Sequence, residues 1–306
     1  MFEFIVRRVL WTIPVILLIS SLTFVLMKSV PGGPFNSTER ALIPAIKANL
    51  EARYHLDWPL WKQYLQYMKG FFTWDLGPSY TYRARTVEDI LNQQWPVTIQ
   101  LGLCAFLIAL CVGVPLGVLS AVKQNSLIDH GSMVVAMLGV SIPAIALGPF
   151  LIWIFGLKLK WFPVATWGTP AHIVLPAVTL ATFYLARFAR ITRASMLQVV
   201  REEYIQTARA KGLREIVVNV KHAFRNALIP VSTIAGPAFA DVITGSLVVE
   251  RIFAVPGLGR YYVMAITNRD YPVIMATTLL FALLIVFMNL LVDLSYGVLD
   301  PRIRYN

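Results

Sequence analysis

Long apolar runs are the feature of this chain that most constrains its fold. A helix that crosses about 30 Å of hydrocarbon needs roughly 20 mostly apolar residues, because every backbone N–H and C=O in lipid must be paired within the helix. Six runs qualify as candidates: residues 10–27, 97–122, 133–157, 173–185, 228–249 and 273–299. The fourth of these runs is the shortest, and it is followed by an arginine series that begins at Arg187. The six runs predict an all-α, polytopic membrane protein with six transmembrane helices.

The overall composition agrees with that class. Hydrophobic residues make up 57% of the 306 residues and charged residues only 14%, whereas a soluble domain carries about 25% charged residues. The formal net charge is +11, and the basic residues lie beside the apolar runs. We therefore expect them to face anionic membrane lipid, and we expect no nucleic-acid partner.

Catalytic and metal-binding groups are not indicated. Cys104 and Cys111 lie in one apolar run, two helical turns apart, which is too far for a disulfide. The four histidines have no metal-ligand spacing, and no nucleophile lies in a pattern with a base. We expect neither an enzyme nor a bound cofactor or metal.

The apolar runs divide the chain into three parts. Residues 1–30 are expected to form an amino-terminal tail and an uncleaved first span, because no small-x-small cleavage site follows the run. Residues 31–96 are expected to form an external helical insert, with apolar residues at helical spacing in 41–56 and again from Trp58 to Met68. Residues 97–306 would form a core with five spans and a cytoplasmic loop at 188–227. The basic residues of the short loops predict that both termini are cytoplasmic.

The loop between the fourth and fifth spans is unusually polar. Residues 188–225 are predicted to form helices broken at Gly212, because basic residues precede this glycine as at many helix ends. Ile216, Val217, Val220 and Phe224 indicate a second amphipathic helix. A short stiff helix with a glycine corner suits insertion into a groove on a partner protein.

This loop resembles the EAA loop of ABC importer permeases. Gln206, Thr207 and Ala208 stand at the places of Glu-Ala-Ala, and Gly212 stands at the place of the glycine. The stretch from Thr207 through residues 222–230 is similar to the version in dipeptide and oligopeptide permeases, although its Leu-Ile-Pro comes later than in the commonest form. Further similar segments are residues 7–8, 31–34, 245–250, 256–259, 269–272 and 300–302. Over essentially its whole length, the chain resembles the B-type permease subunits of that family.

The resemblance implies a transport subunit rather than an enzyme. It implies half of a peptide translocation pathway in the bacterial cytoplasmic (inner) membrane, working by alternating access. The implied partners are a second, C-type permease subunit, two ABC ATPase subunits that bind the ATP and Mg, an extracytoplasmic peptide-binding protein, and membrane lipid. The implied ATPase-docking loop consists of Gln206, Thr207, Ala208, Arg209, Ala210, Lys211 and Gly212.

Four polar residues in the fifth and sixth runs are candidates for lining the pathway. Asp241 lies about 20 Å into its run at 1.5 Å per residue, where a carboxylate is expensive. It would either attract the cationic end of a peptide or bind a neighbouring helix. Thr244 and Ser246 are weaker candidates, because hydroxyls in spans often bond back to their own helix. Asp293 is expected at a gate or in packing.

Pro256, Gly257 and Gly259 are expected to form a tight turn at the external mouth, as a contact for the delivery protein. The Gly-Lys-Ser/Thr ending of a phosphate loop is missing there. The insert is either a folded spacer on the membrane surface or a seat for that delivery protein.

Two alternatives to peptide import remain open. One is an ABC importer of a non-peptide solute, such as a nickel complex or an oligosaccharide. The other is an ion-coupled secondary transporter, in which Asp241 would carry a proton.

Overall fold

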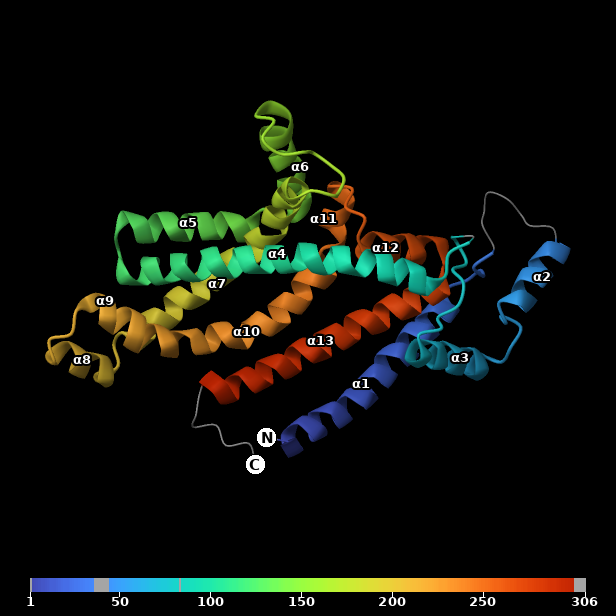
Figure 1. Cartoon of the computed structure of the whole chain (residues 1–306), viewed down its shortest axis with the longest axis horizontal. Coiled ribbons are helices and arrows are strands. Elements are labelled where there is room, and N and C mark those ends of the chain that lie inside the picture. Colours follow the sequence, from blue (N-terminus) through green and yellow to red (C-terminus); the bar gives the residue numbers. More distant parts are fainter. Residues whose placement is uncertain (1, 36–43, 83, 300–306) are drawn as a thin grey trace. The chain divides into compact units, whose positions relative to one another are not determined.

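The computed structural model describes residues 2–35, 44–82 and 84–299. Every regular element in these ranges is helical (Figure 1). The motif at 300–302 and the basic carboxyl terminus lie outside the described residues. The elements are α1 (Phe2–Ser29), α2 (Pro44–Arg53), α3 (Leu60–Thr73), α4 (Val87–Val122), α5 (Leu127–Ser141), α6 (Ala144–Leu151), η1 (Ile152–Lys158), α7 (Pro170–Val199), α8 (Glu203–Ala210), α9 (Glu215–Val217), η2 (Val218–Ala223), α10 (Phe224–Gly245), α11 (Leu247–Ile252), α12 (Leu258–Asn268) and α13 (Tyr271–Leu299), where η1 and η2 are π-helical.

The predicted all-α membrane fold is confirmed, with one correction to the spans. Among the described residues, five helical stretches are long and apolar enough to cross a membrane: Val6–Ser29, Val87–Val122, Pro170–Val199, Glu215–Ile252 and Tyr271–Leu294. The predicted third span is not one straight helix. It consists of Leu127–Ser141 and Ala144–Lys158, which are bent by 107° to each other, and the count is six only if this pair is one span.

Pro143 explains the bend in the third span. The residue before a proline is disfavoured in the helical region, because the proline ring collides with its backbone. Ile142 accordingly has extended dihedrals (φ −90°, ψ 113°), and Pro143 is the N-cap residue that precedes α6. A proline within an apolar run indicates a kink, and the extended backbone of Ile142 turns this kink into a break between two helices.

Two other helices are longer than their apolar runs. Helix α7 begins with Pro170 in its first turn, where a missing N–H costs nothing, and continues through the arginine series to Val199. Helix α4 begins at Val87, ten residues before the predicted span. Thr86 and Asp89 form a reciprocal cap there: the Thr86 N–H donates to Asp89 Oδ2 at 3.1 Å, and the Asp89 N–H donates to Thr86 Oγ1 at 3.3 Å.

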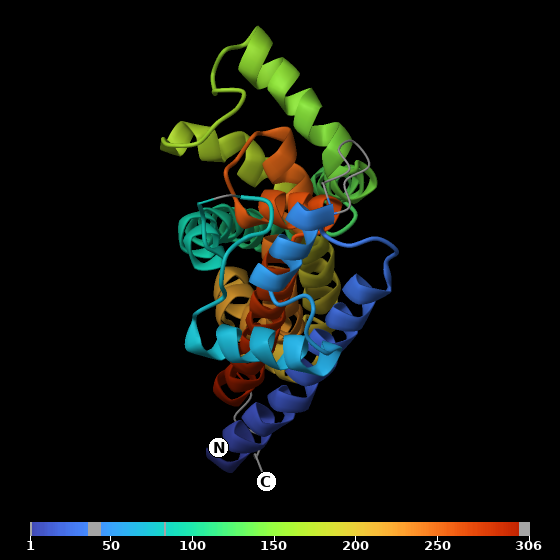
Figure 2. The ribbon, with the colours of Figure 1, turned by 90° about the vertical axis from the view of Figure 1, so that its right-hand side faces the viewer.

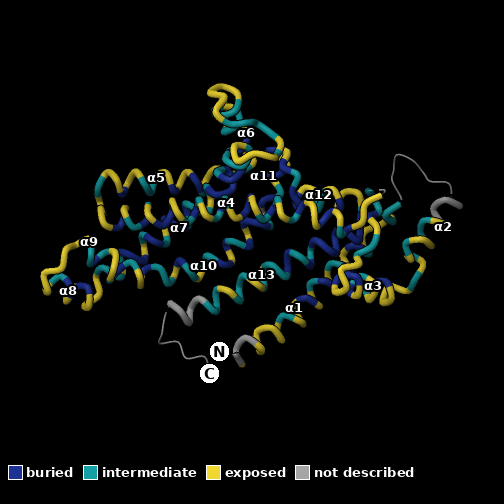
Figure 3. The backbone as a smooth tube through the Cα atoms, in the orientation of Figure 1, coloured by how far each residue is buried: buried dark blue, intermediate teal, exposed yellow. Residues whose placement is uncertain are grey.

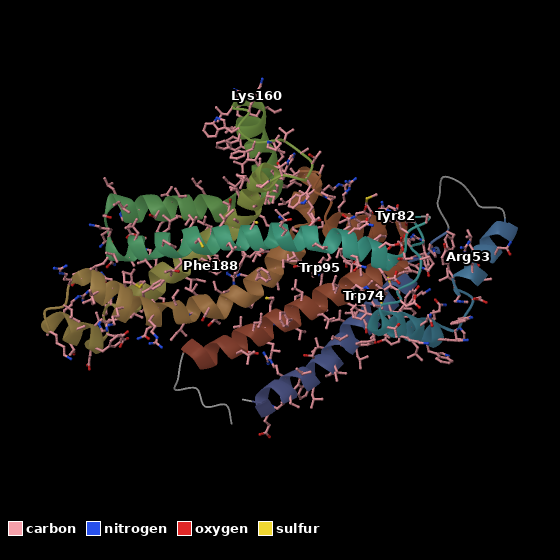
Figure 4. All side chains as sticks on the ribbon, in the orientation of Figure 1. Arg53, Trp74, Tyr82, Trp95, Lys160 and Phe188 are labelled. Atoms are coloured by element: carbon pink, nitrogen blue, oxygen red, sulfur yellow. The ribbon has the colours of Figure 1, made fainter. Side chains whose placement is uncertain are left out.

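The described chain falls into two compact units. The first contains residues 98–256 and the end of the chain from Phe287, and the second contains residues 2–97 and 257–286. In the first unit, α5 and α10 both pack along α7, and α6 contacts α7 and α11. Phe188 of α7 is buried and meets Phe106 of α4 edge to face at 6.0 Å between ring centroids (Figure 4).

Two glycines allow α4 to approach α7 closely in the first unit. A methyl group on Gly117 would come within 2.6 Å of Thr192 Cβ, and one on Gly113 would come within 2.6 Å of the Leu185 carbonyl oxygen. The Gly-x-x-x-Gly spacing is therefore a packing device in this protein.

In the second unit, the insert folds against the first helix. The predicted helices of the insert are present as α2 and α3, and α3 crosses α1 (Figure 2). Tyr64 Oη of α3 lies 2.8 Å from Ser20 Oγ of α1 and accepts from Ser21 Oγ at 3.1 Å. Ile16, Met68 and Phe71 form a buried cluster with Leu279 of α13.

Candidate functional site

Helix α8 is a two-turn helix between α7 and the turn at Gly212. Glu203 lies in its first turn and Arg209 in its last turn, so both charges interact favourably with the helix dipole. Gly212 has a positive φ of 74°, and its N–H donates to the Arg209 carbonyl oxygen at 2.9 Å. This is the left-handed turn that glycine favours after a helix, and the predicted break at Gly212 is confirmed.

The inner face of α8 is anchored in a buried cluster. Ile205 and Ala208 point into this cluster, and both are buried. The cluster joins α8 to the ends of α4, α7 and α10. Its buried members are Ala121, Met196, Ile205, Ala208, Val218, Ala223 and Ala227. Tyr204 adds a polar link at the edge, since it accepts a hydrogen bond of 2.6 Å from Asn226 Nδ2.

The outer face of α8 is open to solvent, as the alternating colours of Figure 3 show. Gln206, Thr207, Ala210 and Lys211 are exposed, and so is Gly212. Ala208 therefore holds the helix in place, whereas its four exposed neighbours form the surface available to a partner. We call Gln206, Thr207, Ala210 and Lys211 the outer face of α8.

Arg209 joins the two sides of the glycine turn. Its Nε donates to Glu215 Oε1 at 2.9 Å, and its Nη1 lies 3.5 Å from the Val200 carbonyl oxygen. The side chains of Arg209 and Glu215 are 36% and 63% exposed. Exposed ion pairs contribute about 0–1 kcal/mol, so this pair orients the turn more than it stabilises it.

An ion pair between a partly exposed arginine and a buried aspartate joins α7 to α5, and the sequence analysis did not predict it. Arg193 of α7 donates to Asp129 of α5 through Nε (2.7 Å) and Nη2 (2.9 Å). Asp129 also accepts from Ser120 Oγ of α4 and from the Asn125 N–H at 3.0 Å. One carboxylate thus ties together α4, α5 and α7. The available signal was Ser126 three residues before Asp129, which is a helix-start pattern.

A second buried carboxylate joins α11 to α4 in the same unit. Glu250 of α11 accepts from Thr98 Oγ1 of α4 at 2.8 Å and from Ser246 Oγ at 2.7 Å. All three side chains are buried. Ser246 thereby serves packing in this chain, and its role as a pathway residue remains a prediction.

The other pathway candidates lie in different surroundings. Asp241 is exposed on α10, and Asp293 is half-buried on α13. Thr244 Oγ1 bonds back to its own helix, to the Ala240 and Asp241 carbonyl oxygens at 3.0 and 3.3 Å. The roles proposed for these three residues remain predictions.

The chain turns between α11 and α12 at Phe253 and Ala254, and not at the predicted Pro256, Gly257 and Gly259, because Gly257 caps α12 and Gly259 lies within it. The residue with positive φ is Ala254 (52°), whereas Gly257 is extended (φ −97°) and precedes α12. Gly257 and Gly259 are buried, and Pro256 is half-buried. The contact of these three residues with a delivery protein remains a prediction.

The second unit has its own buried carboxylate, also missed from the sequence. Asp270, between α12 and α13, accepts from Ser79 Oγ and from the N–H groups of Tyr80 and Thr81, each at 3.1 Å. Tyr82 in the same loop packs against Tyr261 of α12 at 5.2 Å between centroids (Figure 4). The loop at the end of the insert is therefore fixed to the start of α13.

Tyrosines of the insert are sheltered from water near this carboxylate. Burial raises the pKa of Tyr67 to about 12, and its hydroxyl lies 2.9 Å from that of Tyr80. Burial also raises the pKa of Tyr80, with Tyr67 and Asp270 adding to the effect. Both phenols are neutral hydrogen-bonding groups in the physiological range.

Two family models match the chain. The binding-protein-dependent transport system inner membrane component matches residues 113–305, and the amino-terminal model of such membrane components matches residues 1–102. The chain belongs to this family. It is therefore an inner-membrane transport subunit.

Relatives and solved structures agree with this membership. The permease is 48% identical to the dipeptide transport system permease protein DppB of Bacillus subtilis, over 99% of this chain and 98% of the relative. It is 43% identical to the oligopeptide transport system permease protein OppB of Salmonella typhimurium, over the whole of both chains. An inward-facing structure of the MetNI methionine ABC transporter matches 69% of this permease and 96% of its own chain, with a TM-score of 0.58 at 17% identity. That likeness concerns the fold alone.

Proposed function

We propose that this permease forms half of the translocation pathway of an ATP-driven importer of dipeptides or oligopeptides. The observation that carries the proposal is the two-sided character of α8. Its inner residues are buried among three helices that reach the membrane spans, while its outer face is open. The names of the relatives supply the substrate class, and the description of the family supplies a binding protein as a partner.

The outer face of α8 would insert into a groove on an ATPase subunit. A force on this face would pass through Ile205 and Ala208 into α4, α7 and α10, because these side chains share one buried cluster. The Asp129–Arg193 pair would keep α5 and α7 moving as one body. Such rigid coupling suits a protein that changes between two packings under an external bias.

The proposed complex contains further subunits. A second, C-type permease would supply the other half of the pathway. Two ABC ATPases would bind ATP and Mg, and an extracytoplasmic binding protein would deliver peptide at Pro256, Gly257 and Gly259, where the chain enters α12. Both termini and α8 would lie on the cytoplasmic side, and this permease would itself bind no nucleotide.

Within the pathway, Asp241 would attract the cationic amino terminus of a peptide. Thr244 and Ser246 would line the pathway beside it, and Asp293 would act near the gate. Asp241 has the strongest support of the four, because its carboxylate is exposed on a helix long and apolar enough to span a membrane.

The outer face of α8 can be tested without disturbing its anchor. Gln206→Trp and Ala210→Trp place large groups on exposed positions and leave the buried cluster intact. We expect both variants to lose copurifying ATPase and the uptake of a labelled dipeptide. Gln124→Trp, on the exposed turn between α4 and α5, is the matched control. Capture of peptide by the isolated binding protein should be unchanged.

The same experiment separates the alternatives. Full uptake by both α8 variants would contradict docking through this face. Uptake that persists without any ATPase, and that depends on Asp241, would favour an ion-coupled transporter. ATP-dependent uptake of a nickel complex or an oligosaccharide but not of peptide would keep the transport mechanism and change the substrate.

A further inference from the structure

A groove lies between α1 and α3 in the second unit. Its volume is about 390 Å³, and both helices supply its walls. Val25, Lys28 and Ser29 contribute from α1, and Leu60 and Trp61 contribute from α3. The groove is separate from the α8 surface, which belongs to the other unit.

The walls of this groove are largely apolar and open. Val25 and Leu60 are each 57% exposed, and Trp61 is 65% exposed. Helix α1 is long and apolar enough to cross a membrane, and lipid chains are chemically suited to its exposed apolar side chains. Tryptophan is enriched where a membrane meets water, and Trp61 beside the last turns of α1 fits that level.

A cation is placed at one end of the groove. Lys28 Nζ lies 4.9 Å from the ring centroid of Tyr271 and 5.8 Å from that of Phe24. Among the residues that the structure describes, no carboxylate lies within ion-pair distance of this ammonium group. An ammonium ion carries three hydrogen-bond donors, and aromatic faces satisfy its charge only in part.

The combination selects an occupant with two chemically different parts. We propose that this groove binds one acidic phospholipid, with an acyl chain along Val25 and Leu60 and the phosphate at Lys28. A free anion would gain nothing from the apolar walls, and a zwitterionic lipid would bring a second cation to Lys28. The lipid would brace α3 against α1, next to the contact between Tyr64 and Ser20.

The test measures lipid retained by the purified, intact complex. The complex is placed in nanodiscs with equal amounts of phosphatidylglycerol and phosphatidylcholine of identical acyl chains, released, and weighed by native mass spectrometry. We expect the wild type to retain phosphatidylglycerol preferentially. In Lys28→Gln, the ratio of retained phosphatidylglycerol to phosphatidylcholine should fall about fivefold, which is the usual contribution of one lysine beside acidic lipid. Lys28→Arg should keep most of the wild-type ratio.

Lys62→Gln is the matched control. Lys62 also lies over an aromatic ring, that of Trp58 at 3.7 Å, but it does not line the groove. Its substitution removes the same charge and a similar cation–π contact, and it should leave the preference unchanged. Equal retention of both lipids by the wild type would overturn the proposal, as would an unchanged preference in Lys28→Gln. Displacement of the lipid by millimolar inorganic phosphate would also overturn it, since the apolar groove would then be irrelevant.

Discussion

Arg193 and Asp129 form a two-pronged ion pair that joins α7 to the first turn of α5. The Asp129 side chain is only 1% exposed, while that of Arg193 is 27% exposed. The buried carboxylate therefore depends on its protein partners for hydrogen bonds, whereas the guanidinium can also be hydrated. This difference in exposure predicts which substitution destabilises the protein more.

Arg193→Gln should destabilise the permease more than Asp129→Asn. The first change leaves a buried carboxylate with only Ser120 and the Asn125 N–H as partners, and loss of one member of a buried pair costs about 3 kcal/mol or more. The second change lets Arg193 turn to solvent. Thermal unfolding of the purified complex in one lipid mixture measures both variants. The double variant should resemble Asp129→Asn, and a larger loss in Asp129→Asn than in Arg193→Gln would contradict this account.

Gly212 variants should weaken coupling in a fixed order. Gly212→Ala forces a Cβ into the left-handed region, which costs about 1 kcal/mol, although the space around it is open. Gly212→Asn should cost less, since asparagine tolerates this conformation. Gly212→Pro should cost most, because it also removes the N–H that bonds Arg209. Peptide uptake and the amount of copurifying ATPase should both be reduced least in Gly212→Asn, more in Gly212→Ala and most in Gly212→Pro. Equal uptake by all three variants would contradict the importance of the turn.

Gly117→Ala should separate α4 from α7. Its new methyl group would collide with backbone and with Thr192, neither of which can move far, and overpacking of this kind costs about 1–3 kcal/mol. Gly131→Ala is the control, because that glycine is helical and has no atom near its would-be Cβ. Thermal unfolding should show a lower midpoint temperature for Gly117→Ala than for the wild type. The midpoint of the Gly131→Ala control should not fall. A midpoint equal to the wild type would show that the two helices adjust freely.

Asp270→Asn should release the loop that follows α3. Asparagine has one acceptor oxygen where Asp270 offers two to Ser79, Tyr80 and Thr81. Hydrogen bonds to a charged group contribute about 1.5–3 kcal/mol, so the loop should open more often. Trypsin cleavage after the exposed Arg85 should then be several times faster. Asp75→Asn, an exposed change in the same insert, should leave the rate unaltered, and a resistant Asp270→Asn protein would contradict the anchoring role.

The helices of the membrane spans and of the insert follow from local chemistry, which explains why they were predictable. Apolar runs must form helices in lipid, and a glycine after basic residues ends α8 whatever surrounds it. The bend at Pro143 and the early start of α4 after Thr86 are also specified by residues close to them in the sequence. Pro143 indicates a kink, whereas the first turns of α4 lie outside the predicted run because polar side chains interrupt residues 87–96.

The buried carboxylates could not be predicted in the same way. Asp129, Glu250 and Asp270 look like ordinary charged residues at the ends of apolar runs. Their partners lie 64, 152 and up to 191 positions away in the chain. No local pattern specifies contacts across such separations.

The amino-acid sequence alone determined the class of protein, the existence of α8 and the turn at Gly212, because these depend on transfer to lipid and on backbone dihedrals. Only the tertiary structure decided which side of α8 is open. Ile205 and Ala208 became its anchor because the ends of α4, α7 and α10 meet there and remove them from water. The division of α8 into an anchored and an exposed face is a property of packing, and the proposed coupling depends on that division.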